Sequence, residues 1–434
     1  MGSDADRTTI ALLHRRAGWG LAPGELDARV GDGVPATIDR LVDPDQHGVP
    51  PSPDPWADID LTAYRPGPQA TQAEKQQARQ AVRQQSEAAI GAWLDHLAST
   101  PRPLEEWMAW FWHGHFVSGL DKVKVPLLMV QQLRTYRELA FAPLPELVRA
   151  ATTDPAMLLY LDGGTSTGSQ PNENYGRELL ELFTLGIGNY GEDDVQAGAK
   201  ALTGWTVDRR TGQSTFARAR HDDSAQRYLG VDNVHDVDTV VAAVTAHKAC
   251  APFIAAKLAR TILGPTVDDA LVQDLAATFA ASGLDTRVLV RAILEAAASG
   301  RAQPAFVQPV PWLVAAQRAT GSTLPGRSRL ASLRAAGQVP MLPPNVAGWP
   351  LGPVWLGAST VIARYNLASA LAASAPSGNP ALAAAEAFDL DGLADSLARP
   401  EGFADATRAA LAQVKTDPRA VLTTALSSPE LSLC

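Results

Sequence analysis

The chain has 434 residues, of which 46% are hydrophobic and 19% charged, a composition typical of a globular protein with one large domain or two ordinary ones. Its 37 Lys and Arg residues against 46 Asp and Glu residues give a net charge of −9. This balance argues against a nucleic-acid-binding protein, because such proteins need a basic surface to displace counterions. No run of about 18 apolar residues is present, so we expect no membrane span and no membrane partner.

The first third of the chain predicts helices joined by one long loop. Apolar residues recur at spacings of three and four, as in amphipathic helices, and they predict short helices at 10–17, 23–29 and 35–41. The segment 43–70 is rich in Pro and Asp, and we expect a loop there. Thr71 and Glu74 form a capping-box pattern that starts a long helix.

The rest of the chain predicts further helices and one small β-element. Asn172 starts the best-marked helix, which ends near Gly186. Thr, Val and Phe residues flanking a turn predict a small β-hairpin near 205–218. We therefore expect a mainly α fold, a single large irregular helical domain over residues 1–434. The helices of 375–434 form either part of this domain or a C-terminal subdomain.

Two simple features concern the compartment of the protein. Cys250 and Cys434 lie far apart in the sequence and predict free thiols rather than a disulfide framework. The N-terminal residues are short and polar and lack the basic and then apolar pattern of a signal peptide. As the sequence stands it predicts a cytoplasmic protein, and an exported one if a leader has been trimmed.

The strongest local signal is the sequence N-E-N-Y-G-R-E-L-L-E-L-F-T-L-G at 172–186. On a helix, Asn174, Arg177, Glu178 and Glu181 share one face. Two carboxylates beside an arginine are suited to holding a metal or a substrate cation, or to proton transfer. The alternative is a solvated face with an Arg–Glu pair, or a buried ion-pair network that imitates an active site.

Histidines supply the second and third signals. His113 and His115 can bind one ion only if the helix ends between them, because on a regular helix they diverge by about 200°. Otherwise they are two histidines packed in an aromatic helix end. His221 and Asp222 are suited to a third metal ligand and a base, or else they form a surface turn.

The fourth signal is a Pro-, Gly- and Trp-rich loop at 338–356. Its tryptophans are suited to walling a pocket that stacks a sugar or another flat ligand, although large tryptophans more often fill a core. No phosphate-binding loop, dinucleotide fingerprint, G-x-S-x-G or H-E-x-x-H motif is present, so we expect no nucleotide cofactor. The expected substrate-binding residues are Asn174, Trp205, Asn345, Trp349 and Trp355.

Together these segments resemble a large bacterial family catalogued as domain of unknown function 1800, and the resemblance covers nearly the whole chain. It rests on L-H-R-R-A-G-W-G at 13–20, W-H-G-H-F at 112–116, the helix 172–186 with L-T-G-W at 202–205, H-D at 221–222 with L-G at 229–230, and Arg318 with P-P-N-V-A-G-W-P at 343–350.

The resemblance leaves the activity open. It implies relatives that are exported and a sulfatase-like protein as a partner, which indicates polymer or envelope chemistry. Two positions depart from the family pattern. Arg227 is the nearest basic residue after the H-D pair, where members often carry Lys. Phe183 stands where many members carry His.

Three hypotheses follow for the function. In the first, a metal-dependent enzyme, hydrolytic or oxidative, holds Zn, Mn, Fe or Cu. Its ligands are His113, His115 and His221, and its catalytic residues are Arg177, Glu178, Glu181 and Asp222. In the second, a metal-free, glycosidase-like hydrolase uses paired carboxylates on a carbohydrate-like or other small substrate. In the third, the chain is a non-catalytic helical scaffold whose polar motifs are buried networks.

Overall fold

The computed structural model describes residues 3–62, 66 and 69–434, and it confirms the mainly α fold with a β-hairpin near 205–218. The N-terminal helices α1 (Asp4–Ala17), α2 (Glu25–Asp32) and α3 (Val34–Val42) pack against one another. Among the described residues of the expected loop 43–70, the structure has only the short 3-10 helix η1 (Pro44–His47). Residues 63–65 and 67–68 of that loop lie outside the described residues.

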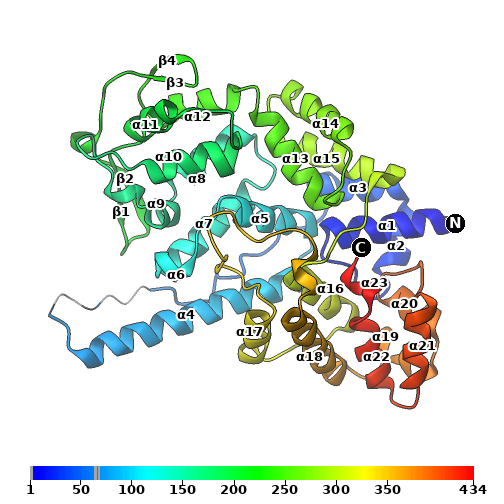
Figure 1. Ribbon diagram of the computed structural model, residues 1–434. Coiled ribbons are helices and arrows are strands. Elements are labelled where there is room, and N and C mark those ends of the chain that lie inside the picture. The colour runs from blue at the N-terminus through cyan, green and yellow to red at the C-terminus, as the bar shows by residue number, and fades with distance from the viewer. Residues whose placement is uncertain (1–2, 63–65, 67–68) are drawn as a thin grey trace.

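The long helix that follows begins at the expected capping box. The Thr71 hydroxyl accepts the Glu74 N–H, and the Glu74 carboxylate accepts the Thr71 N–H. This helix, α4 (Gln72–Ser99), projects from the body at its N-terminal half, which is mostly exposed (Figure 1). Its C-terminal half packs into the centre through Trp93, which is fully buried.

The centre of the molecule is aromatic. It is built on α5 (Pro103–His115), α6 (Leu120–Val123) and α7 (Pro126–Glu138). Tryptophans of α4 and α5 contact one another, with the rings of Trp93 and Trp110 5.7 Å apart. The Trp112 Nε1–H donates to the Ala140 carbonyl, so the buried indole is satisfied as such groups generally must be.

A lobe of helices and two hairpins lies above α7 in Figure 1. It contains α8 (Leu144–Thr153), α9 (Pro155–Tyr160), η2 (Gly163–Thr165), α10 (Glu173–Glu178), the π-helix η3 (Leu179–Thr184), α11 (Glu192–Ala201), η4 (Arg218–Arg220) and α12 (Val237–Ala246). The expected hairpin is β1 (Trp205–Asp208) paired antiparallel with β2 (Gln213–Phe216), with Trp205 opposite Phe216.

A second hairpin in this lobe was not expected from the sequence. Strands β3 (Gln226–Tyr228) and β4 (Val231–Val234) are joined by Leu229 and Gly230. Both turn residues have positive φ angles, 53° and 81°, as a tight two-residue hairpin turn requires. The strand signal was hidden because β3 has three residues and carries the polar side chains of Gln226 and Arg227.

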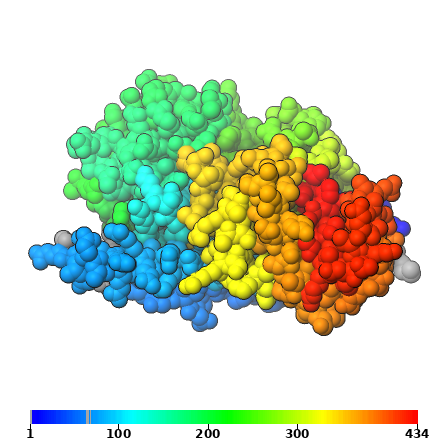
Figure 2. Space-filling model, turned by 60° about the horizontal axis from the view of Figure 1, so that its bottom comes forward, coloured from blue at the N-terminus to red at the C-terminus, as the bar shows by residue number. Residues whose placement is uncertain are grey.

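In Figure 1, helices of the second half of the chain lie above and below the N-terminal helices. This half contains α13 (Cys250–Ile262), α14 (Asp269–Ala281), α15 (Thr286–Ala296), the π-helix η5 (Ala297–Arg301), α16 (Pro309–Thr320), α17 (Gly326–Ala335), η6 (Pro353–Leu356), α18 (Ala358–Ser374), α19 (Pro380–Ala387), α20 (Leu390–Ser396), α21 (Asp405–Gln413), α22 (Pro418–Leu426) and α23 (Pro429–Ser432). Figure 2 shows the segment from α17 to α18, yellow to orange, between α4 in blue and the C-terminal helices in red.

The C-terminal helices are joined to the main body by packing and by hydrogen bonds. Helix α22 packs against α18, and the Trp312 Nε1–H donates to the Leu426 carbonyl at 3.1 Å. Leu411 and Leu422 belong to the same apolar cluster as Trp93 of the centre. Both cysteines are unpaired, and Cys250 is buried.

Within the described ranges, no single helix is long and apolar enough to cross a bilayer. Helices α12 and α13 reach that length and apolarity only when taken together, and they are bent by 74°.

Candidate functional site

The two histidines of the W-H-G-H-F segment point to different sides of α5. The helix continues through His115 instead of ending at Gly114, so the rings diverge as a regular helix requires. His113 lies edge-on to Trp93, Trp110 and Trp349. The ring of His115 packs instead against Phe111 and Phe183.

His113 is a buried core histidine. The Met341 N–H donates to its Nε2 at 3.0 Å, and its Nδ1 is buried without a hydrogen-bond partner among the described residues. Burial lowers the pKa of this imidazole to about 3. The ring is therefore neutral, and it ties the loop after α17 to α5.

His115 contacts the C-terminal end of the helix that the motif at 172–186 forms. Helix α10 continues as the π-helix η3. The carbonyls of Leu182 and Phe183 lie at its C-terminal end, where carbonyls generally accept no hydrogen bond from within the helix. The His115 Nε2–H donates to the Phe183 carbonyl at 2.9 Å, and the Lys257 ammonium donates to the Leu182 carbonyl at 3.1 Å. The Nδ1 atom of His115 is buried and has no partner in the described part of the chain.

The polar face of α10 and η3 lies on another side of that helix. Asn174 is exposed, and Arg177 pairs with Glu173 and Glu192 at 3.2 and 2.6 Å. The hydrogen bond to Glu192 and the charges of both carboxylates raise the pKa of Arg177. Its charge is thus committed to carboxylates on the surface.

Glu178 and Glu181 lie one turn apart on this face. Burial and the neighbouring Glu181 carboxylate raise the pKa of Glu178. The Tyr190 hydroxyl donates to Glu181 at 2.9 Å. Asp121 of α6 and Glu178 both lie close enough to Tyr160 to add to the rise in the Tyr160 pKa that burial causes.

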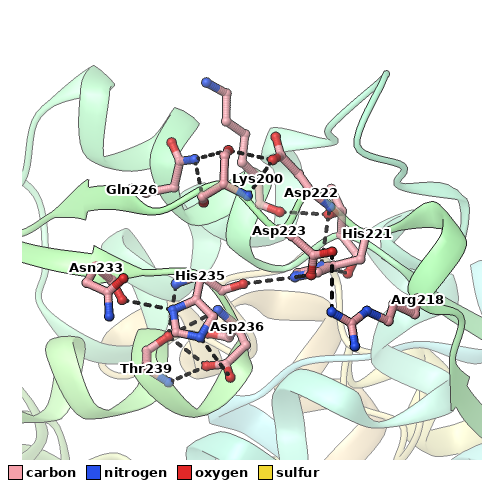
Figure 3. A network of polar contacts seen from close by, with 12 residues as sticks. Lys200, Arg218, His221, Asp222, Asp223, Gln226, Asn233, His235, Asp236 and Thr239 are labelled. Atoms are coloured by element: carbon pink, nitrogen blue, oxygen red, sulfur yellow. Dashed lines mark hydrogen bonds and ion pairs between the residues drawn. The ribbon is translucent and has the colours of Figure 1, made fainter.

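His221 and Asp222 lie between the two hairpins (Figure 3), far along the chain from His113 and His115. Each ring nitrogen of His221 lies 2.9 Å from a backbone carbonyl, Nδ1 from Thr203 and Nε2 from His235. Asp222 accepts from the Ser224 hydroxyl and N–H, which lowers the pKa of its carboxyl. This network fixes the hairpins to each other and leaves neither nitrogen of His221 free for a ligand.

The Pro-, Gly- and Trp-rich loop docks on α5 at a glycine. Gly348 has a φ of 80°, and a Cβ there would overlap the carbonyl oxygen of Gly114. The close approach places Trp349 on Trp110 with ring centres 5.0 Å apart and planes 12° from parallel. Asn345 forms the turn that precedes it by accepting the Ala347 N–H at 2.9 Å.

Trp355 and Trp205 were also predicted to bind a substrate, and each contacts another part of the protein. Trp355 is 4% exposed, and its Nε1–H donates to the Pro350 carbonyl at 2.8 Å. Trp205 packs on Phe216 across the hairpin, with ring centres 5.5 Å apart.

A cavity of about 150 Å³ lies where α1, α5, α13 and the Trp349 loop meet. We call it the Lys257 cavity. Its walls are aromatic, and its lining includes Trp107, Trp110, Phe111, His115, Phe306 and Trp349. It brings together three of the sequence motifs, at 13–20, 112–116 and 343–350, and the motif at 172–186 reaches it through the backbone carbonyls that hold His115 and Lys257.

The Lys and Arg side chains that line this cavity give it a basic character. Arg15, Arg16 and Lys257 line it, and no Asp or Glu side chain of the described residues does. Arg15 pairs with Glu401 at 2.7 Å. Arg16 donates to the backbone carbonyls of Ile262, Gln303 and Cys434.

The Lys257 ammonium has one hydrogen-bond acceptor, the Leu182 carbonyl, and no carboxylate of the described residues lies within ion-pair distance of it. Burial lowers its pKa to about 8. Burial and the Lys257 charge keep the pKa of the neighbouring His115 well below its usual value. A lysine with a lowered pKa in a cleft indicates a functional site on physical grounds.

The structure does not bring the sequence-predicted ligands together. His113, His115 and His221 lie in three different surroundings, and the described residues contain no group of three or more His, Cys, Asp or Glu placed to hold a metal ion. Of the predicted residues, His115 and Trp349 line the Lys257 cavity; Arg177, Glu178 and Glu181 share the outer face of the motif helix.

The comparisons with known proteins agree with the motifs. The family described as protein of unknown function (DUF1800) matches residues 12–433. The chain belongs to this family. No curated protein and no solved structure matches it. The family assignment covers nearly the whole chain and leaves the activity unassigned.

Sequence reasoning missed Lys257, Arg15 and Arg16 as site residues. A signal for Lys257 was present, because it is the one acidic or basic residue between Lys248 and Arg260 in an otherwise apolar helix. A lone lysine on the apolar side of a helix either extends its amine to water or places it in a protein cavity.

Proposed function

We propose that the chain is an enzyme that binds a small organic anion in the Lys257 cavity and uses Lys257 for proton transfer. The observation that carries this proposal is the burial of Lys257 in an aromatic cavity that no acidic side chain of the described residues lines, which lowers its pKa to about 8. A group with a pKa near the working pH takes up and releases protons most effectively.

The residues that line the cavity have different roles in this proposal. Arg16 and Lys257 attract an anionic group, and the stacked rings of Trp110 and Trp349 form a flat apolar wall for the body of the substrate. The Nδ1 atom of His115, which has no partner among the residues that the structure describes, is an acceptor for a substrate N–H or O–H. Apolar walls also strengthen each charge–charge interaction inside the cavity, because they exclude water.

A metal-dependent mechanism finds less support in the geometry. Both ring nitrogens of His221 face carbonyls, and Nε2 of His113 accepts a backbone N–H. These contacts would have to break for either ring to bind an ion. Elemental analysis of chelator-free protein tests the point, and about one equivalent of a transition metal that is lost in His115→Ala would favour the metal mechanism.

A second proposal is a carboxylate pair on the outer face of the motif helix. The raised pKa of Glu178 supports a general acid there. A glycosidase-like hydrolase also needs a carboxylate facing it from another element, and Asp121 is the acidic residue of α6 that lies near Tyr160 together with Glu178.

Ligand binding distinguishes the two proposals. The full chain is screened by thermal shift against small planar carboxylates and carbonyl compounds, beginning with benzoate, and hits are measured by calorimetry. Lys257→Met should weaken binding of a hit about tenfold or more, because a charge-assisted hydrogen bond is lost.

Lys415→Met is the matched control, since Lys415 is exposed and does not line the cavity. It should bind as the wild type does. Equal affinities for Lys257→Met and wild type, or loss in Glu178→Gln alone, would overturn the first proposal.

A further inference from the structure

A second cavity lies on the opposite side of the last turn of α1. It has a volume of about 210 Å³ and is enclosed by α1, α2, α3, α16 and the segments at 49–50 and 100–103. We call it the His14 cavity. Its apolar lining comes from Leu21, Leu41, Val49, Pro50, Pro101 and Pro103. The function proposed for Lys257 does not use it.

His14 has unused hydrogen-bonding capacity in this cavity. His14 is 6% exposed, and neither of its ring nitrogens has a hydrogen-bond partner among the described residues. Gly18 leaves space for the ring, since a Cβ at Gly18 would lie 2.9 Å from Nδ1. Buried polar groups nearly always have a partner, so the ring indicates a ligand or water in the cavity.

The charged groups around His14 are mostly basic. Arg29 of α2, Arg40 of α3 and Arg318 of α16 line the cavity with one acidic residue, Glu25 of α2. Glu25 accepts from Arg318 at 2.8 Å and from the Ala22 N–H at 2.7 Å. Three arginines against one glutamate leave a local charge of 3 − 1 = +2.

The arginines retain donors for a ligand. Arg318 is 9% exposed, and its Nε atom is buried without a partner in the described chain. Arg29 uses one nitrogen for Asp32 at 2.7 Å. Arg40 forms no ion pair with any carboxylate that the structure describes. Planar guanidinium groups present paired donors that match the oxygens of phosphate.

We propose that the His14 cavity binds a tetrahedral oxyanion, as free phosphate or as the phosphate group of a small ester, through His14, Arg29, Arg40 and Arg318. Burial, together with the charges of Arg318 and Arg29, lowers the pKa of His14 to about 3 in the empty cavity. A bound dianion reverses this electrostatic balance, because an opposite charge favours the protonated ring. Binding therefore raises the pKa of His14.

Calorimetry at low ionic strength tests binding, with inorganic phosphate and glycerol 2-phosphate as the two probes. Arg40→Gln is the first variant, because Arg40 is half-buried and pairs with no carboxylate of the described residues, so its loss should leave the fold intact. It should weaken binding of both probes about tenfold or more. Arg79→Gln, an exposed arginine of α4, is the control and should bind as the wild type does.

The two probes separate the sources of the ligand. Phosphate binding equal to or tighter than that of the ester indicates a free anion, and tighter binding of the ester indicates a phosphomonoester. Absence of binding for both probes, or equal weakening by Arg40→Gln and Arg79→Gln, would overturn the proposal.

The protonation of His14 gives a second readout that a merely structural cluster would not produce. In protein labelled with ¹³C at histidine Cε1, His14→Gln identifies the His14 resonance. Without phosphate this resonance should not titrate above about pH 5. Saturating phosphate should move its midpoint upward by more than one pH unit, and an unmoved midpoint would contradict the proposal.

Discussion

Two cavities lie on either side of the last turn of α1, and consecutive residues of that turn face different ones. His14 faces a cavity lined by three arginines, whereas Arg15 and Arg16 face the aromatic cavity that contains Lys257. Both cavities attract anions, but their basic groups differ in one property. Burial brings the pKa of a lysine near neutrality, whereas an arginine remains charged.

This difference separates chemistry from binding. Lys257, with a pKa of about 8, exists in both protonation states near neutral pH and can transfer a proton. The arginines of the His14 cavity keep a fixed charge and can only hold an anion, with His14 as the group that adjusts. Burial thus has different consequences for different basic side chains within one protein.

The largest expected effect comes from the glycine that seats the Trp349 loop. Gly348→Ala should lower the free energy of unfolding by about 3 kcal/mol or more, because the new Cβ meets the Gly114 carbonyl and the φ angle is positive. Gly378→Ala is the control, since Gly378 also has a positive φ, 84°, but open space around it. It should cost about 1 kcal/mol.

Urea denaturation measures both variants. Gly348→Ala should also abolish the binding of benzoate and similar carboxylates in the Lys257 cavity. Phosphate binding in the His14 cavity should remain. If the two glycine variants lose equal stability, the close docking of the loop on α5 is wrong.

The buried histidines predict a stability that falls in acid. Burial lowers the pKa values of His14 and His113 to about 3, and that of His115 well below its usual value. The unfolded chain binds more protons than the folded chain below about pH 6.5, so stability is full above that pH and decreases as the pH falls toward 3. Each histidine lowers the free energy of unfolding by up to about 1.4 kcal/mol for each unit by which the pH falls.

Asp154 acts in the opposite direction. Burial raises its pKa to about 7, so its contribution is present at low pH and is lost as the pH rises from about 4 to 7. Three histidines against one aspartate leave a net loss of stability between pH 7 and 5. Denaturation at pH 7 and at pH 5 measures this loss of stability. Saturating phosphate should reduce the loss by the part that His14 contributes. A protein more stable at pH 5 than at pH 7 would contradict this account.

A smaller effect is expected for the aromatic wall. Trp349→Phe should cost about 1 kcal/mol of stability through the loss of ring stacking on Trp110, and it should weaken any ligand of the Lys257 cavity. Trp355→Phe is the matched variant, because Trp355 is buried in the same loop region but does not line the cavity. It should leave binding unchanged, as measured by calorimetry.

The smallest effect on stability is expected in the His14 cavity. Arg40→Gln should change the free energy of unfolding by less than about 0.5 kcal/mol in the absence of phosphate. The stabilisation that phosphate gives the wild type in thermal denaturation should shrink in this variant. A large loss of stability without phosphate would show that Arg40 holds the fold rather than a ligand.

Local sequence rules predicted much of the fold and little of the site. The capping box at Thr71 and Glu74 and the hairpin at 205–218 were predictable because neighbours in sequence determine them. The sequence left open whether His113 and His115 diverge, because that depends on whether α5 continues through Gly114. The importance of Lys257 depends on a carbonyl of a π-helix about 75 residues earlier, a long-range contact that no local pattern contains.

The central claim is that Lys257 titrates near neutral pH inside its cavity. Brief labelling with acetic anhydride across a pH series, read by mass spectrometry of the peptides, measures the midpoint for Lys257, with Lys415 as an internal reference. We predict a midpoint near pH 8 that shifts upward when an anionic ligand is bound. A midpoint above pH 10, at the ordinary value for lysine, would contradict the account.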